Sequence, residues 1–306
     1  MNLPVIVNSS TILEPFQMFL INIVHDIYPS IFKHVDFASL VNIRHSCSLL
    51  HYHVDAYIPR RLAWILSAYC TDTTTLMKIM SSTGSFITGR STLAFIFPEI
   101  VVHPSSKNIH LTIACKSVSI PELLQFFQSD GYENDYALMS AEDYPSCLLL
   151  FNRDLHKFVS IIHGSSSPLF LVPDFSYTAF MNAISPQSYA IFYPALTFNK
   201  ISLAKFDVPS YIMNWRTCEN ERLMDAQHFL MNYRFTFLDS EHSRTNNCPK
   251  TGCRTYRKSN DNQNLHFHIG NVDNCSSCST TIMWHLGGRN CLSSQEPFYA
   301  HSIAIV

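Results

Sequence analysis

The stretch from Ser81 to Phe95, SSTGSFITGRSTLAF, decides the fold class that this sequence predicts. Ser85 to Thr88 is a short candidate strand that ends at Gly89, a residue suited to a tight turn. Ser91 to Phe97 is long enough for one or two helical turns, and Ile109 to Ala114 alternates apolar and polar side chains as a half-buried strand does. The region therefore predicts a strand, a glycine turn, a short helix and a second strand.

The segments that follow extend this pattern. Ser119 to Glu122 has the spacing of a capping box, and an amphipathic helix is expected after it, with Gly131 just past its end. Leu148 to Phe151 and Phe158 to Ile162 flank turn residues and predict a hairpin. We also expect a helix around Tyr177 to Ile184. Strands and helices in this order predict a layered α+β domain.

The N-terminal part of the chain has the periodicity of helices. Apolar residues recur at helical spacing from Phe16 to Ile27 and from Leu40 to Val54, which predicts two helices with one apolar face each. Pro59 is expected to interrupt the second helix, and Leu62 to Tyr69 to form a third. These helices can pack on one another without a sheet.

Composition excludes several classes of protein. Hydrophobic residues make up 47% and charged residues 14% of the chain, whereas disorder requires low hydrophobicity and high charge. The formal net charge of −2 argues against a dedicated nucleic-acid binder. The longest uncharged stretch, Phe175 to Asn199, contains Asn182, Pro186 and Pro194, so we expect no membrane-spanning segment. No Lys or Arg precedes Lys33, so a secretory signal is not expected and the protein is expected to be intracellular, cytoplasmic or nuclear.

The chain divides into three predicted regions: a helical part (1–75), a core with C-terminal helices (76–237) and an irregular region (238–306). Four cysteines of the third region form two pairs with short internal spacing, namely Cys248 with Cys253 and Cys275 with Cys278. Such pairs resemble a Cys₄ zinc ribbon, because tetrahedral Zn²⁺ takes four thiolate or imidazole ligands. The alternative is free thiols, which we expect because the first pair is widely spaced.

Several short motifs occur in order between Asp55 and about Thr197. They are Thr83-Gly84, Ile87-Thr88-Gly89, Gly131-Tyr132 and the run FMNAI from Phe180 to Ile184. In these motifs the chain resembles a large group of fungal, mostly uncharacterised proteins with a degenerate nucleotidyltransferase-like core. The resemblance implies a mixed sheet with flanking helices.

The same resemblance implies where a nucleotide site would lie. In nucleotidyltransferases a Gly-Ser turn holds the triphosphate through backbone N–H groups, and two carboxylates on the following strand bind Mg²⁺. Here Arg90 follows Gly89 where the family has Ser, and Asn108 and His110 stand where the two Asp residues would be. The resemblance therefore implies a degenerate site without catalytic carboxylates, and we expect no cofactor there.

The segment from Ala38 to Leu50 contains an R-x-x-C-x-x-L pattern that begins at Arg44 and includes Cys47. This segment resembles the second half of an F-box, and the helix predicted from Phe16 to Ile27 would supply the first half. An F-box binds the linker subunit of SCF ubiquitin ligases, so the resemblance implies that subunit as a partner. The alternative is a plain helical subdomain.

Three functions remain open on these observations. The first is an interaction protein built on a non-catalytic nucleotidyltransferase-like core. The second is an active nucleotidyltransferase with carboxylates supplied elsewhere, for which Glu99 and Asp130 are the nearest acidic residues. The third is a substrate adaptor of an SCF-type ubiquitin ligase. The carboxylates at the strand face separate the first two functions, and binding to the linker subunit tests the third.

Overall fold

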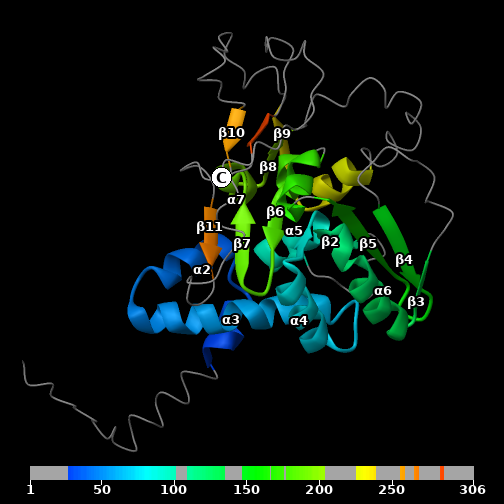
Figure 1. Ribbon diagram of the computed structural model, residues 1–306. Coiled ribbons are helices and arrows are strands. Elements are labelled where there is room, and N and C mark those ends of the chain that lie inside the picture. Colours follow the sequence, from blue (N-terminus) through cyan, green and yellow to red (C-terminus); the bar gives the residue numbers. More distant parts are fainter. Residues whose placement is uncertain are drawn as a thin grey trace, which may run out of the picture.

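The computed structural model of the chain describes residues 27–100, 109–134, 147–165, 167–175, 177–203, 225–238, 256–258, 265–268 and 283–285. Helices and a large mixed sheet form the described part, with α3 (Ser48–Leu66) running below the strands in Figure 1. The fold is therefore α+β, as the sequence predicts. No helix among the described residues is long and apolar enough to cross a membrane.

The large sheet contains eight described strands. In order across the sheet they are β11 (Leu265–His268), β7 (Ser188–Ile191), β6 (Asn182–Ile184), β1 (Phe86–Thr88), β2 (Leu111–Lys116), β5 (Lys157–Gly164), β4 (Cys147–Asn152) and β3 (Tyr132–Asn134). Within this sheet β2 and β5 pair in parallel and every other described pair is antiparallel, so the sheet is mixed.

Two further strand pairs lie outside the large sheet. They are β8 (Ile201–Leu203) with β9 (Thr236–Leu238), in parallel, and β10 (Tyr256–Lys258) with β12 (Met283–His285), antiparallel.

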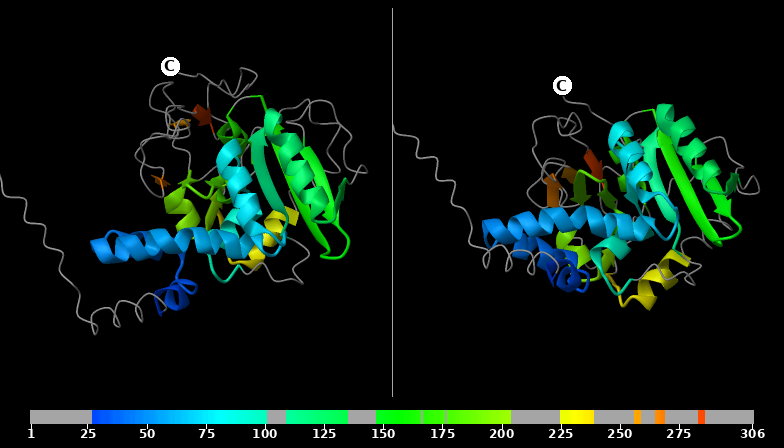
Figure 2. Two further views of the ribbon diagram at one scale, coloured as in Figure 1. Left: turned by 60° about the horizontal axis from the view of Figure 1, so that its bottom comes forward. Right: turned by 90° about the horizontal axis from the view of Figure 1, so that it is seen from below.

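Helices come from every part of the described chain. Besides α3 they are α2 (Phe37–Arg44), α4 (Thr73–Thr83), α5 (Arg90–Ile96), α6 (Ile120–Ser129) and α7 (Pro194–Phe198), and residues 27–32 and 225–232 are also helical. Figure 2 shows α4 and α6 side by side in front of the sheet.

The two faces of the sheet have different covers. Ile87, Leu111 and Ile113 point to the face that carries the helices and belong to the larger buried apolar cluster. Phe86 and Ala114 point to the opposite face, where a 3-10 helix at Pro168–Asp174 packs on them. Alternate residues of each strand thus pack into two different hydrophobic cores, one on each face of the sheet.

The predicted strand–turn–helix–strand unit is confirmed, and so is the hairpin, which β4 and β5 form. Ile109 is buried as predicted, although the hydrogen-bonded ladder of β2 begins at Leu111. These segments were predictable because their periodicity and turn residues are local features of the sequence.

The prediction of a helix break at Pro59 is wrong, because α3 continues through this proline. Proline removes one backbone N–H donor and leaves the carbonyl four residues earlier, that of Asp55, without its helical partner. Pro59 lies near the solvent side of α3, next to exposed Arg60, so water can satisfy that carbonyl.

The predicted helix around Tyr177 to Ile184 is also wrong. A 3-10 turn at Thr178–Phe180 leads directly into β6, whose residues pair with β1 and β7. All three residues of β6, including polar Asn182, are buried, so the strand lacks the alternation of buried and exposed residues that marks a half-buried strand.

The capping box predicted at Ser119 does not form, although the helix after it does. Ser119 ends a 3-10 turn and has nearly helical backbone angles, φ −91° and ψ −5°. A capping side chain needs an extended backbone to reach the amide three residues on, and Ser119 makes no such hydrogen bond. The prediction that Gly131 lies just past the end of the helix is confirmed, because α6 ends at Ser129 and Gly131 has a φ of +85°.

Candidate functional site

Three of the four residues at the degenerate motif lie in the described structure. The antiparallel pairing of β1 with β2 places Thr88 opposite Thr112. This register brings Gly89 and Arg90, which follow β1, to the end of the sheet where His110 precedes β2. Asn108 lies outside the described residues. The turn and the start of β2 therefore lie at the same end of the sheet.

Gly89 makes the sharp turn between β1 and α5. Its angles, φ +67° and ψ −141°, lie in a region that side-chain-bearing residues avoid. A Cβ atom at this position would lie 3.2 Å from Cε1 of Phe175. The turn is tightened by Thr92 Oγ1, which donates a hydrogen bond to the Gly89 carbonyl at 2.6 Å. Both backbone angle and space therefore require glycine here.

Arg90 is the first residue of α5. Its guanidinium forms an ion pair with Asp225 and lies 5.1 Å from the centre of the Phe229 ring. Asp225 and Phe229 belong to the helical segment at 225–232, far along the chain. Phe229 itself is buried. Arg90 therefore connects this distant segment to the core.

His110 lies on the sheet face opposite α4 and α6, in a row of rings. Its ring centre is 5.0 Å from that of Phe158, which in turn is 4.5 Å from that of Phe151. The rings belong to neighbouring positions before β2 and on β5 and β4, so the row crosses the sheet. His110 thus takes part in aromatic packing at the position of the expected carboxylate.

The strands around the turn carry no acidic side chain. Their sequences are FIT in β1, LTIACK in β2 and KFVSIIHG in β5. Thr88 presents a buried hydroxyl there that has no hydrogen-bond partner among the described residues. A face that holds Mg²⁺ needs oxygen ligands with negative charge, which these strands do not supply.

The two acidic residues named above as the nearest alternatives have other partners. Glu99 Oε1 lies 2.6 Å from Nζ of Lys200. The Asp130 carboxylate accepts hydrogen bonds from the backbone N–H and the hydroxyl of Thr71, at 3.0 and 2.5 Å. Each carboxylate therefore stabilises a contact between segments that are distant in the chain.

Sequence reasoning missed a buried cation beside the hairpin. Lys157 is only 3% exposed, and its ammonium lies 5.7 Å from the centre of the Tyr69 ring. Burial lowers the pKa of Lys157, because a charged ammonium loses its hydration there. Tyr69 donates to the carbonyl of Ile109 at 2.8 Å, and Tyr132 donates to the carbonyl of Tyr69 at 2.7 Å. A lone Lys in a hairpin gives no sequence signal of such burial.

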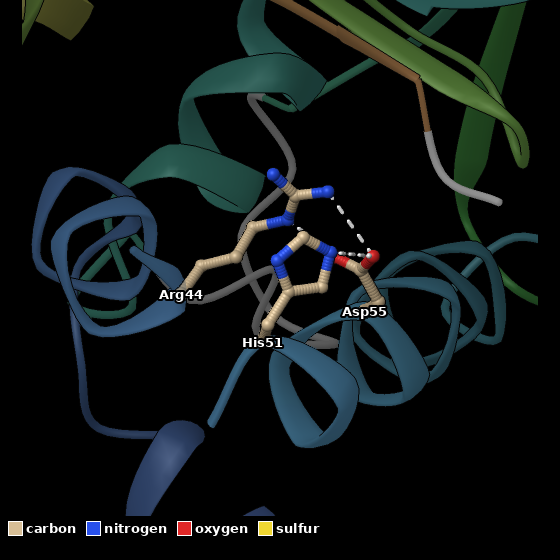
Figure 3. Close-up of polar contacts among 3 residues, drawn as sticks. All are labelled: Arg44, His51 and Asp55. Atoms are coloured by element: carbon tan, nitrogen blue, oxygen red, sulfur yellow. Dashed lines mark hydrogen bonds and ion pairs between the residues drawn. The ribbon is translucent and has the colours of Figure 1, made fainter. Parts of the chain in front are cut away.

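The end of α2 and the first turns of α3 carry an ionic cluster, drawn in Figure 3. Arg44 donates to both oxygens of Asp55, with Nε–Oδ1 at 2.6 Å and Nη2–Oδ2 at 3.1 Å. His51 Nε2 lies 3.1 Å from Oδ2 of the same carboxylate. The hydrogen bonds to Asp55 raise the pKa of Arg44. The cluster joins α2 to α3, and Arg44 thereby serves the packing of the two helices.

Cys248, Cys253, Cys275 and Cys278, the zinc candidates, lie outside the described residues. Within the described ranges, no group of three His, Cys, Asp or Glu side chains is arranged to hold a metal ion. Comparisons with protein-family models, with curated proteins and with solved structures found no match for this chain. Any function is therefore inferred from the residues alone.

Proposed function

We propose that the protein is an interaction protein built on a nucleotidyltransferase-like core that does not catalyse transfer. The observation that carries this proposal is the ion pair of Arg90 with Asp225 beside the Gly89 turn. Arg90 could attract a phosphate at this turn through its charge, but its guanidinium is paired with a carboxylate of the chain itself. The strands next to the turn add no carboxylate for Mg²⁺.

Two alternative functions remain, and the tests below distinguish each of them from the proposal. An active nucleotidyltransferase would need relocated carboxylates, and Glu99 and Asp130 would have to leave their present partners to serve it. An adaptor role, with the linker subunit of an SCF-type ubiquitin ligase as partner, is favoured by the large apolar side chains that the helical part exposes, such as Ile27, Ile31 and Leu49.

Calorimetric titration of the full chain with the Mg²⁺ complexes of ATP, GTP, CTP and UTP tests the first proposal. We expect no binding heat for any of the four. The triple change Asn108→Asp, His110→Asp and Arg90→Ser should create Mg²⁺ binding, and Arg90→Ser alone should not, because it adds no carboxylate. Mg²⁺-dependent transfer of labelled nucleotide by the unaltered protein would refute the proposal.

The partner and the metal need separate measurements. A pull-down with the purified linker subunit tests the adaptor role, with Leu49→Glu as the variant that should abolish binding if Leu49 contributes. Elemental analysis of the full chain tests the zinc site at Cys248, Cys253, Cys275 and Cys278, where we propose that no zinc is bound. One equivalent of zinc per chain would overturn the proposal that no zinc is bound.

An intracellular location, cytoplasmic or nuclear, is proposed together with the interaction role.

A further inference from the structure

A serine and a histidine meet where two neighbouring parallel strands end. β2 ends at Lys116 and Ser117 follows it directly, whereas His163 is the second-last residue of β5. The Ser117 Oγ atom lies 3.1 Å from Nδ1 of His163. In open α/β sheets, small molecules bind outside the carboxyl ends of the parallel strands. The pair therefore lies at an end of the sheet that suits a ligand.

The pair has the arrangement of a nucleophile and its general base. A serine hydroxyl is a weak nucleophile until a base within hydrogen-bond reach takes its proton, and the Oγ–Nδ1 distance is within that reach. With its own proton on Nε2, the His163 ring accepts the hydrogen of Ser117 at Nδ1. Burial lowers the pKa of His163, because the charged ring loses hydration, so the ring is neutral at pH 7. Geometry and protonation state both suit proton transfer from Ser117.

The turn after Ser117 supplies backbone donors for a developing negative charge. Ser117–Ser119 is a 3-10 turn that continues into α6, and the Ile120 N–H donates to the Ser117 carbonyl. The N–H groups of Val118 and Ser119 precede this hydrogen bond, so no carbonyl of the turn accepts from them. Such N–H groups beside a nucleophile can stabilise the oxyanion that forms when an ester is attacked.

We propose that Ser117 and His163 form a dyad that hydrolyses short-chain carboxylic esters. Ser117 Oγ attacks the ester carbonyl, and its proton passes to Nδ1 of His163. The tetrahedral intermediate then expels the alcohol, which takes that proton from His163, and the acyl group stays on Ser117. Water attacks the acyl group with His163 again as base, which releases the carboxylic acid and restores both residues.

The surroundings of the dyad define the substrate class. Ser117 is exposed, and its neighbour Val118 is 82% exposed, so an apolar side chain is available to contact a short acyl chain. No carboxylate of the described residues forms an ion pair with His163, so the ring lacks the third group that orients the base in a triad. We therefore expect slow turnover of reactive esters and none of amides. The dyad and the Gly89 turn lie at opposite ends of β2, so this activity does not depend on nucleotide binding.

Labelling of the full chain with a fluorophosphonate probe tests the nucleophile. The probe bonds to an activated serine with loss of fluoride, and peptide mass spectrometry locates the bond. We expect labelling at Ser117, which Ser117→Ala should abolish. Ser129→Ala is the matched control and should leave labelling unchanged, because Ser129 is also exposed on α6 but donates to the Phe126 carbonyl at 2.7 Å. Absence of the label from Ser117 in the unaltered protein overturns the proposal, whatever the stability of the variants.

Hydrolysis of p-nitrophenyl acetate tests His163 by a readout that a purely structural hydrogen bond would not affect. A general base typically contributes about 10²–10⁴-fold, so His163→Ala should slow acylation of Ser117 at least about 100-fold. Added imidazole should restore part of this rate, because it can accept the proton in place of the missing ring. Ser117→Ala with the same imidazole is the control for hydrolysis by imidazole itself. An unchanged rate in His163→Ala, or no gain from imidazole above this control, overturns the dyad.

Discussion

Gly84 and Gly89 have similar φ angles, so substitutions at these two positions distinguish backbone strain from steric crowding of a Cβ atom. Gly84 (φ +65°, ψ +26°) lies in the left-handed helical region, and a Cβ there would meet no atom within 4 Å. Gly89 lies in a glycine-only region and would also crowd Phe175. We expect Gly84→Ala to lower the free energy of unfolding by about 1 kcal/mol and Gly89→Ala by about 3 kcal/mol. Equal losses in urea denaturation would contradict this account.

A substitution at Leu111 tests whether one face of β2 is buried in the core. Its side chain is fully buried and its strand pairs with both β1 and β5, so little of the cavity left by a smaller residue can collapse. Leu111→Ala should lower the free energy of unfolding by about 2–5 kcal/mol in chemical denaturation. Val118→Ala, at an exposed position, should change it by less than about 0.5 kcal/mol. A similar effect of both changes would refute the burial of Leu111.

The described thiols should differ sharply in reactivity. Burial raises the pKa of Cys70 to about 12 and that of Cys115 to about 11, because the thiolate loses hydration. At pH 8 only about one in a thousand Cys115 thiols, and still fewer of Cys70, is ionised. Cys47 and Cys147 are exposed. In iodoacetamide labelling read by mass spectrometry, these two should react first. Early labelling of Cys70 in the folded protein would be inconsistent with its burial.

At the scale of single residues, the sequence predicted the Gly89 turn but not the contacts that the residues around it make. The turn at Gly89 followed from a local run of strand and helix formers. The partner of Arg90 did not, because Asp225 lies 135 residues along the chain. The burial of Lys157 depends on Tyr69 in the same way. Contacts between distant residues have no signature in spacing or composition.

Among the elements, α3 offers a direct test through Pro59. The ring removes one helical hydrogen bond from the middle of a 19-residue helix. Pro59→Ala should therefore raise the free energy of unfolding by about 1–3 kcal/mol, as measured by thermal or urea denaturation. Ala63→Gly on the same helix is the reverse control and should lower it by about 1 kcal/mol. No gain from Pro59→Ala would mean that the ring makes contacts which compensate.

Helices and strands were predictable where only one of their faces is buried and where typical turn residues separate them. β2 shows the alternation of such a strand, and the β4–β5 hairpin has turn residues between its strands. β6 is buried on both faces, so the largely apolar segment that contains it matched a helix equally well. Pro59 misled because the penalty for proline depends on the solvation of one carbonyl, which sequence does not reveal.

For the whole molecule, β1 shows how far the sheet depends on distant segments. β1 pairs with β2 on one side and with β6 on the other, and its Phe86 is covered by the 3-10 helix at Pro168–Asp174. A chain that ends at Gly164 lacks both β6 and this cover. We expect such a chain to show no cooperative thermal transition by circular dichroism, whereas the full chain should show one. A cooperative transition in the shortened chain would show that the first half folds independently.

The position of β1 in the sheet also sets an order for folding during synthesis. A ribosome adds residues one by one, and the central strand acquires its second neighbour only after Ile184, almost a hundred residues later, has been made. Until then the apolar side chains of the first half, and one edge of β1, are open to other chains. Pairing over such sequence distances is slow. During that interval the exposed edge of β1 and the apolar side chains of the first half have to be kept from binding other chains. The same holds for any sheet whose central strand pairs with strands that are far apart in the sequence.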